Sequence, residues 1–349
     1  MASNENIVKT VVDIGNGYIK AILGEMSSDG KWLRVIKYAE VASIGIKKSN
    51  IENTIELSSA LGTALDKLKA TGYMIDKITI GIGGQNVKTK RATIVYDFDE
   101  KEITNEEIKV FYRKAENEML TVDEKLIHRE MYNIKVNNSG IVKRAQGIVG
   151  NQIKADVYMV YMEEAELERY EDVVNKSGAE IERIIYAPFA ASRALLTSQE
   201  KQKGVILIDI GEGSTDITLF KYNRLIYTAS IPVGGMHYVN DLALTLYNAS
   251  NTRDLNNRGI NNRDAAEVLD KYLKKEISTD NKIYVKDKVT CFEKDVKAVI
   301  NARTVDIARM IKEVLKNTGY AGFIEKGIVL TGGATIVDGL LEKINEKTG

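Results

Sequence analysis

The segments "VVDIGNGYIKAIL" at Val11–Leu23 and "LIDIGEGSTDITLF" at Leu207–Phe220 share one pattern. In each, an apolar run stops at Asp-Ile-Gly-X-Gly and a second apolar run follows. Alternate glycines permit a tight turn and a close backbone approach, so each segment predicts a strand, a turn and a second strand. One such break is usually only a hairpin turn. Two copies at matching points of the chain predict an internal duplication.

The residues at the two breaks suit a phosphate and a metal ion. Successive backbone N–H groups in such a turn can line a concavity for phosphate oxygens. Asp13 and Asp209, each at a strand end, suit a Mg²⁺ ion that keeps most of its waters. Lys20 adds a positive charge, and hydroxyl groups with a second carboxylate follow the second break at Ser214, Thr215 and Asp216. The two breaks together predict a phosphate clamp.

A third glycine element lies in "GIVLTGGATIVDG" at Gly327–Gly339, which predicts a buried strand, a turn at Gly332-Gly333 and the start of a helix. Glycines there let a flat ring such as adenine lie against the backbone, although a helix start that merely needs small residues is the alternative. The chain contains no Gly-x-x-x-x-Gly-Lys-Ser/Thr phosphate loop. The stretch "GIGGQN" lacks the full dinucleotide pattern and is interpreted as a turn at a domain junction.

Composition excludes several classes of protein. The chain has 349 residues, which predicts two or more domains, and its 49 basic and 49 acidic residues give no excess charge for nucleic acid. One cysteine, Cys291, excludes a disulfide framework and a cysteine-rich zinc site. Two histidines far apart, His128 and His237, argue against a histidine metal site or a Ser-His-Asp triad. Neither a secretory signal nor an apolar run long enough to span a membrane is visible.

Apolar runs that alternate with helix-period segments predict an α/β protein whose two halves repeat one plan. The first half contains an inserted α+β subdomain, where Thr104 and Glu107 predict a capping box ahead of a helix. Strands are expected in that insert at 128–136, 141–150 and 153–162. A long amphipathic helix that ends at Gly319 is expected in the second half. The expected domains are 1–84 with 164–202 (first lobe), 85–163 (insert), 203–236 with 298–349 (second lobe) and 237–297 (peripheral subdomain).

These features resemble the actin/Hsp70/hexokinase superfamily, and within it the FtsA family of bacterial actin-like cell-division proteins. The resemblance rests on "DIGNGYIKAILGE", "GIKKSNIEN", "ITIGIGGQNVKTKRA", "DIGEGSTDITLF", "IPVGGMHYVNDLA" and "GIVLTGGA", and it runs along nearly the whole chain. It implies a duplicated actin-like ATPase fold with two lobes around a nucleotide cleft, in which 85–163 is subdomain 1C, 237–297 is subdomain 2B, and the lobe cores are 1A and 2A. The alternative is the related pilus-assembly protein PilM.

The resemblance also implies a binding site for ATP and Mg²⁺. Asp13 and Asp209 would orient the hydrated ion, and Asp216 would steady its turn. The residues expected at the nucleotide are Gly15, Asn16, Gly17, Lys20, Gly211, Gly213, Ser214, Thr215, Gly234, Gly235, Gly332, Gly333 and Ala334. Relatives that hydrolyse quickly place a glutamine on a helix corresponding to Tyr186–Leu196, which here has no Gln, Glu or His. We therefore expect slow hydrolysis at most, with no confident catalytic residue. A small-molecule kinase and a nucleotide-independent scaffold are the alternatives.

The partners implied by the resemblance are further copies of the chain in a filament, other division proteins at the insert, and the C-terminal tail of the tubulin-like protein FtsZ on a region near 237–300. An acidic tail could meet Arg253, Arg258, Arg263, Lys271, Lys274 and Lys275, although a solvated charged face is the alternative. Family members act at the inner face of the cell membrane at the division septum. They end in an amphipathic membrane helix, whereas this chain stops at "LLEKINEKTG", so we expect no lipid binding by that route.

Overall fold

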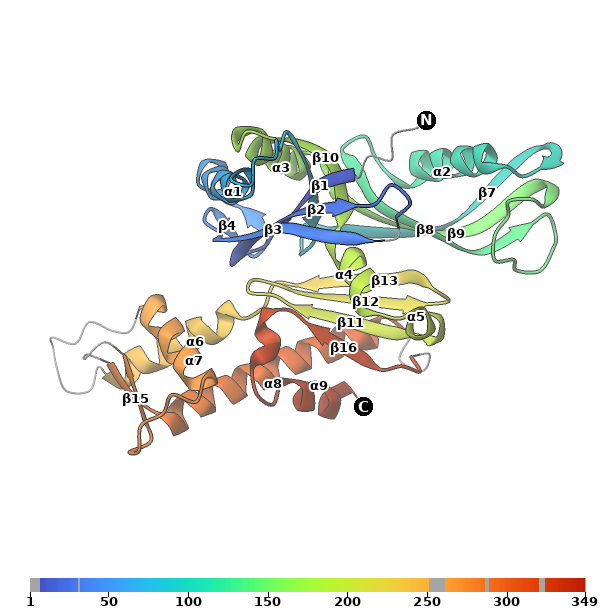
Figure 1. Ribbon diagram of the computed structural model, residues 1–349. Coiled ribbons are helices and arrows are strands. Elements are labelled where there is room, and N and C mark those ends of the chain that lie inside the picture. Colours follow the sequence, from blue (N-terminus) through green and yellow to red (C-terminus); the bar gives the residue numbers. More distant parts are fainter. Residues whose placement is uncertain (1–6, 31, 251–260, 286–288, 320–323, 349) are drawn as a thin grey trace. The chain divides into compact units, whose positions relative to one another are not determined.

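Figure 1 shows the computed structural model, which describes residues 7–30, 32–250, 261–285, 289–319 and 324–348. The chain divides into two compact units, Met1–Ile206 with Thr218–Ala229, and Leu207–Ile217 with Ser230–Gly349. Across the described ranges, no helix is both long and apolar enough to cross a membrane.

The first sheet has five strands in the order β10–β6–β1–β2–β3. Its strands are β1 (Ile7–Ile14), β2 (Tyr18–Met26), β3 (Leu33–Ala42), β6 (Lys77–Ile82) and β10 (Glu180–Tyr186). On β1 and β2, alternate residues such as Val12, Ile19 and Ala21 are fully buried, as the period of a strand requires. They pack in one core with apolar residues of the helices α1 (Thr54–Lys69) and α3 (Glu164–Lys176).

Helix α1 follows from the sequence before it. The Asn53 side chain accepts hydrogen bonds from the backbone N–H groups of Ile55 and Glu56, which satisfies donors that the first turn leaves open. Between β3 and α1 lie two short strands, β4 (Ile46–Lys47) and β5 (Asn50–Ile51), joined by a two-residue turn. Both turn residues, Lys48 and Ser49, have left-handed backbone angles, with φ of 49° and 65°. This is the pattern of a type I′ turn, which usually takes Asn or Gly.

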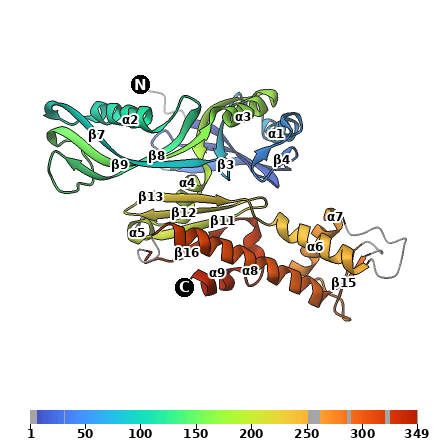
Figure 2. The same cartoon turned by 180° about the vertical axis from the view of Figure 1, so that it is seen from behind.

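The insert forms a separate small sheet with its own core. Strands β7 (Lys88–Glu102), β9 (Val149–Glu163) and β8 (Glu124–Val136) pair in the order β7–β9–β8, and α2 (Asn105–Met119) packs its Phe111 into a shared apolar cluster. Figure 2 shows α2 running along this sheet from the opposite side of the molecule. The predicted capping box is confirmed, because Thr104 and Glu107 exchange side-chain and backbone hydrogen bonds at the start of α2.

Two expectations for the insert are wrong. Residues 141–148 form turns with a single bridge from Val142 to Ile134, and only the end of the expected strand at 141–150 enters β9. The long strand β7 was not expected at all. Its outer half is mostly charged and exposed, so it shows no apolar alternation, and its pairing with β9 holds it in place.

The second sheet repeats the plan of the first, with the order β13–β12–β11–β16. Its strands are β11 (Val205–Ile210), β12 (Thr215–Lys221), β13 (Arg224–Ile231) and β16 (Ile328–Thr331). In both sheets three consecutive strands form a meander, and a strand from later in the chain joins beside the first of them. The predicted duplication is therefore confirmed. The short helices α4 (Ala187–Leu195) and α5 (Ser198–Lys203) precede this sheet in the chain.

The rest of the second unit is mostly helical (Figure 1). It contains α6 (Met236–Ser250), α7 (Asn262–Leu273), α8 (Glu293–Asn317), the 3₁₀ helix η2 (Gly333–Ile336) and α9 (Leu340–Thr348). Helix α8 ends where expected, since Gly319 follows it at a φ of 70°. Strands β14 (Lys282–Val285) and β15 (Val289–Phe292) pair, and place Cys291 opposite Ile283, where the cysteine is only 4% exposed. The predicted domain limits stay a prediction.

Candidate functional site

The first glycine break is a hairpin loop between β1 and β2. The ladder continues to its last pairs, Asp13 opposite Lys20 and Ile14 opposite Ile19, and the Gly15 N–H donates to the carbonyl of Tyr18 at 3.2 Å. A Cβ atom on Gly15 would lie 2.8 Å from that carbonyl oxygen, closer than real Cβ atoms approach. Only glycine therefore fits the first position of the loop.

The carbonyl groups of this loop are bonded into the protein. Ser43 donates its hydroxyl to the Gly15 carbonyl at 2.7 Å and its N–H to the Gly17 carbonyl at 2.8 Å. Within the described ranges, the N–H groups of Asn16 and Gly17 have no acceptor in the protein. Two adjacent amide donors are thus left for an anion.

The side chain of Asn16 has a different place from the one expected. Its amide oxygen accepts the Ser49 N–H at 2.7 Å, and its amide nitrogen donates to the Ser49 hydroxyl at 3.3 Å. The side chain therefore binds the β4–β5 turn, which leaves the backbone N–H of Asn16 as its group for a phosphate. Lys20 is exposed on β2.

The second glycine break is the loop between β11 and β12, and it has the same closing bond. The Gly211 N–H donates to the Ser214 carbonyl at 2.9 Å. The start of α6 then holds the loop carbonyls, because Gly235 donates to Gly211 at 2.9 Å and Met236 donates to Glu212 at 2.8 Å. In the described chain, the N–H groups of Glu212 and Gly213 have no acceptor. The positive end of the α6 dipole lies beside them and favours an anion.

Three predicted glycine segments meet around this loop. A Cβ on Gly234 would lie under 3.0 Å from the carbonyls of Gly211 and Glu212. A Cβ on Gly332 would lie as close to the Asp209 carboxylate and the Ile210 carbonyl, and Gly332 has a φ of 96°. Gly333 is exposed and meets nothing within 4 Å, whereas Ala334 is buried near Gly235. The second unit therefore brings together 209–214, 234–235 and 332–334.

The carboxylates differ in their surroundings. Burial raises the pKa of Asp13, and the ammonium of Lys20 opposes the rise. The residue as a whole keeps an exposed surface, through which a cation could reach it. A bound cation would reverse the shift, because it stabilises the charged form. Asp209 and Asp216 are half-buried. Among the described residues, no three His, Cys, Asp or Glu side chains gather closely enough to hold a metal ion directly.

Two residues of the second loop differ from the expectation. The Thr215 side chain is 1% exposed and donates its hydroxyl to the Val233 carbonyl at 2.7 Å, so a role at a phosphate would require this bond to break. Ser214 is also buried. Glu212 was missed, although the sequence places it where Asn16 stands in the first loop. Burial raises the pKa of its carboxyl group.

The basic residues expected to contact a partner lie in different environments. Arg253 and Arg258 lie outside the described residues, and Arg263 is exposed at the start of α7. Lys271 pairs with Glu267 at 3.3 Å, and Lys274 pairs with Asp270 at 2.8 Å. Lys275 forms no ion pair within the described ranges and lines a pocket.

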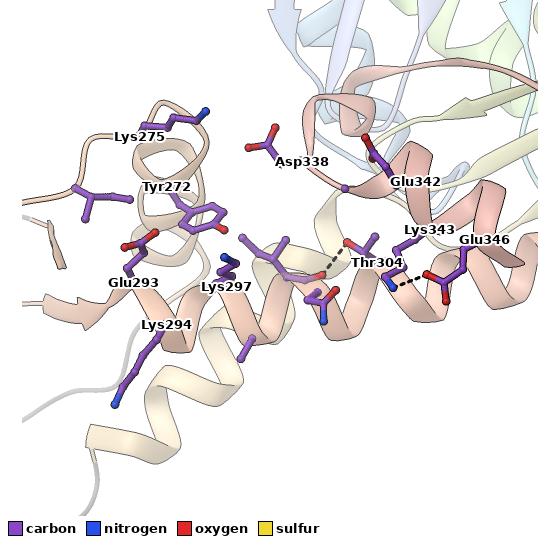
Figure 3. A pocket seen from close by; sticks show the side chains of 15 residues that line it. Tyr272, Lys275, Glu293, Lys294, Lys297, Thr304, Asp338, Glu342, Lys343 and Glu346 are labelled. Carbon is purple, nitrogen blue, oxygen red and sulfur yellow. Dashed lines mark hydrogen bonds and ion pairs between the residues drawn. The ribbon is translucent and has the colours of Figure 1, made fainter.

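This pocket has a volume of about 790 Å³ and lies in the second unit between the end of α7, the first half of α8 and the start of α9. Figure 3 shows Tyr272 and Lys275 on the α7 side and Glu342, Lys343 and Glu346 along α9. Lys343 donates to Glu346 at 2.6 Å. Near α7 the lining includes Lys275, Lys294 and Lys297 together with two acids, Glu293 and Asp338, so lysines outnumber acids at this end by three to two.

Comparison with known proteins agrees with this fold. The family model of the MreB/Mbl protein matches residues 160–349, and the model of the SHS2 domain inserted in FtsA matches residues 84–161. The cell division protein FtsA of Pseudomonas aeruginosa is 26% identical over 347 residues, which cover 96% of this chain and 79% of that protein. FtsA of Bacillus subtilis is 27% identical over 346 residues, covering 97% of this chain and 76% of that protein.

Solved structures with the same fold include actin-like proteins of other functions. The PilM-PilN type IV pilus biogenesis complex contains a chain with a TM-score of 0.66 and 12% identity, covering 98% of this chain and 86% of that one. MreB5 of Spiroplasma citri bound to ADP has a TM-score of 0.55 and 14% identity, covering 97% of this chain and 89% of that one. At such identities these likenesses show the actin-like fold.

Proposed function

Because this chain belongs to the FtsA family of bacterial actin-like proteins, we propose that it binds ATP with Mg²⁺ and acts as a nucleotide-dependent adaptor in cell division. In this role it forms filaments and links the FtsZ ring to the inner face of the cell membrane at the septum. The nucleotide acts as an assembly signal that is hydrolysed slowly.

One observation carries the nucleotide proposal. Each glycine loop turns its carbonyls toward bonded donors in its own unit and leaves two adjacent N–H groups without an acceptor in the described chain. Unpaired backbone donors are costly unless water or an anion binds them, and a pair on one loop suits a phosphate. The same arrangement occurs in both halves of the duplication. An MreB5 bound to ADP shares the fold, which supports a nucleotide as the anion.

The residues present also fit Mg²⁺. Asp13 in the first loop and Asp209 in the second are the residues that would hold the ion, each through a water molecule. Mg²⁺ supplies charge neutralisation of the phosphates when it is bound.

Slow turnover is proposed from the chemistry of α4. Its sequence is "APFAASRAL", in which Ser192 is the one residue whose side chain could orient or deprotonate a water molecule. The Ser192 hydroxyl is fully buried and donates to the Phe189 carbonyl at 2.6 Å. General-base help from this helix is therefore missing. Phosphate release at tens per second would overturn the proposal and favour a kinase or another turnover enzyme.

Titration calorimetry with ATP and Mg²⁺ tests the proposal. We expect binding in the micromolar range for the unaltered protein and at least tenfold weaker binding for Asp209→Ala. Asp172→Ala is the matched control, since Asp172 is an exposed carboxylate on α3 that pairs with Lys176 at 2.6 Å. Absence of binding at millimolar ATP would refute the nucleotide site. Equal affinity of Asp209→Ala and the unaltered protein would refute the metal assignment.

We further propose that the acidic tail of FtsZ docks at the basic end of the pocket between α7 and α8. The support is that three lysines, Lys275, Lys294 and Lys297, line this end of the pocket against two acids, Glu293 and Asp338, because opposite charge steers and orients a peptide. In a pull-down, Lys294→Glu with Lys297→Glu should lose an FtsZ tail peptide, while Lys274→Ala should retain it. Capture of a PilN-type pilus peptide in place of the FtsZ tail would favour the pilus alternative.

A further inference from the structure

A network of side-chain amides surrounds the turn between β4 and β5. The tight turn at 84–87, closed by a bond from the Val87 N–H to the Gly84 carbonyl at 3.2 Å, presents two amide side chains in succession. The Gln85 amide donates to the Lys48 carbonyl at 2.8 Å, and the Asn86 amide donates to the Ser49 carbonyl at 3.2 Å. Two consecutive donors thus hold two consecutive carbonyls. The stretch "GIGGQN" therefore does more than join two domains.

The turn that they hold is under backbone strain. Lys48 and Ser49 both have left-handed angles, which L-residues with a side chain adopt only when the surroundings impose them. Ser49 is 6% exposed, so its carbonyl and N–H need partners in the protein. Asn86 supplies the donor for the carbonyl, and Asn16 supplies the acceptor for the N–H.

The network continues from the turn to the first glycine loop in one direction and to α3 in the other. Asn16, in the middle of the loop, uses both ends of its side-chain amide on Ser49. Asn86 also donates to the Glu166 carboxylate at 3.1 Å. Glu166 lies 3.7 Å from Arg169, which donates to the Ile51 carbonyl at 2.9 Å. Asn86 is therefore anchored on a helix while it holds Ser49, and Ser49 holds Asn16.

We propose that Asn86 is a positioning residue of the nucleotide site, which fixes the first glycine loop in its phosphate-binding conformation through Ser49 and Asn16. This inference rests on the proposed nucleotide function. The N–H groups of Asn16 and Gly17 keep one orientation only while the loop backbone is fixed on both sides. Ser43 fixes the loop carbonyls, and the chain from Asn86 to Asn16 fixes the loop centre. A preorganised loop loses less entropy when an anion binds.

The test measures ATP and AMP affinities, with Mg²⁺, for the unaltered protein, Asn86→Ala and Ser49→Gly. Loosening the loop should weaken binding of the phosphate chain, so Asn86→Ala should lose about tenfold in ATP affinity and less than threefold in AMP affinity. Ser49→Gly keeps both backbone bonds but loses the hydroxyl that accepts from the Asn16 amide nitrogen, so its ATP affinity should fall by less than that of Asn86→Ala. The control is Asn262→Ala, which removes one amide bond at 3.0 Å, to Asn240, in the second unit.

The outcomes are distinct. An unaltered protein that fails to bind ATP would refute the proposed function itself. An unaltered protein that binds ATP, with Asn86→Ala equal to Asn262→Ala, would refute the inference alone. Equal losses for ATP and AMP in a folded Asn86→Ala protein would also refute it, because general destabilisation does not distinguish the number of phosphates. If Asn86→Ala does not fold, Asn86→Ser, which retains a donor, is measured by the same ratio.

Discussion

Replacement of Gly332 by alanine tests whether the close packing around Asp209 determines the second half of the site. Gly332 has a φ of 96° and a ψ of 159°, a region that only glycine occupies readily. Its new Cβ would lie under 3.0 Å from the Asp209 carboxylate and the Ile210 carbonyl. One of these neighbours is backbone of β11, so it cannot move without disturbing the sheet.

The size of the effect follows from two contributions. A side chain in this backbone region costs roughly 1–3 kcal/mol. Forcing an extra methyl group into a packed site costs typically 1–3 kcal/mol more. A total of about 3 kcal/mol corresponds to roughly a hundredfold in ATP affinity if it falls on the site. It corresponds to a fall of about 10 °C in the unfolding temperature if it falls on the fold.

The assay compares Gly332→Ala with Gly140→Ala. Gly140, in the insert, is exposed, lacks a positive φ and has no atom within 4 Å of an added Cβ, so this variant should bind ATP and unfold as the unaltered protein does. Calorimetry with ATP and Mg²⁺ and thermal unfolding followed by circular dichroism measure both quantities. Similar values for the two variants would show that the packing of Gly332 on Asp209 does not control the site.

Three other predictions concern local contacts. Gly234→Ala, whose Cβ would meet two loop carbonyls, should weaken ATP binding at least tenfold, whereas Gly235→Ala, whose Cβ would meet its nearest neighbour, the Ala334 methyl, at 3.5 Å, should weaken it less in the same titration. Phe111→Ala should destabilise the insert by about 3–5 kcal/mol in denaturant unfolding, because the ring is fully buried; a loss below 1 kcal/mol would contradict this packing. Hydrogen bonds from Lys101 and Thr104 lower the pKa of Glu107 to about 2, so its stabilising effect should be complete above pH 4.5 and disappear as the pH falls through 2. The difference in unfolding temperature between Glu107→Gln and the unaltered protein should therefore shrink over that interval, and a constant difference would be inconsistent with the shift.

The parts of the fold that depend on a local sequence signal, such as a turn or a helix cap, could be predicted from the sequence. The two Asp-Ile-Gly-X-Gly breaks identify both hairpins, because turn chemistry is local, and Thr104 with Glu107 identifies the start of α2 for the same reason. Strand β7 could not be predicted in this way. Its charged outer half gains its order from pairing with β9, which lies more than forty residues later in the chain. The turns at 141–148 were missed for the converse reason, since apolar residues there suggested a strand that has no partner along its length.

The candidate site shows the same division. Glycines at the loops were predicted, because close backbone approach excludes other residues wherever the loop sits. The use of the Asn16 side chain was not predicted, because its partner Ser49 stands 33 positions later in the chain and is brought near only by folding. Thr215 has a hydroxyl of the right type beside the loop, but only the structure shows that Val233 uses it. The residue type indicates which hydrogen bonds a side chain can make, and packing determines which partner it bonds.

The single cysteine gives this protein a natural reporter of local opening. Burial in the β14–β15 hairpin raises the pKa of Cys291 to about 11, so the reactive thiolate is rare at neutral pH. Alkylating reagents should therefore label the native protein far more slowly than a free thiol, at a rate set by how often this hairpin opens. Since the sequence has no other thiol, one mass shift would time that motion without any introduced dye or substitution. A partner that binds over the β14–β15 hairpin would slow the labelling of Cys291.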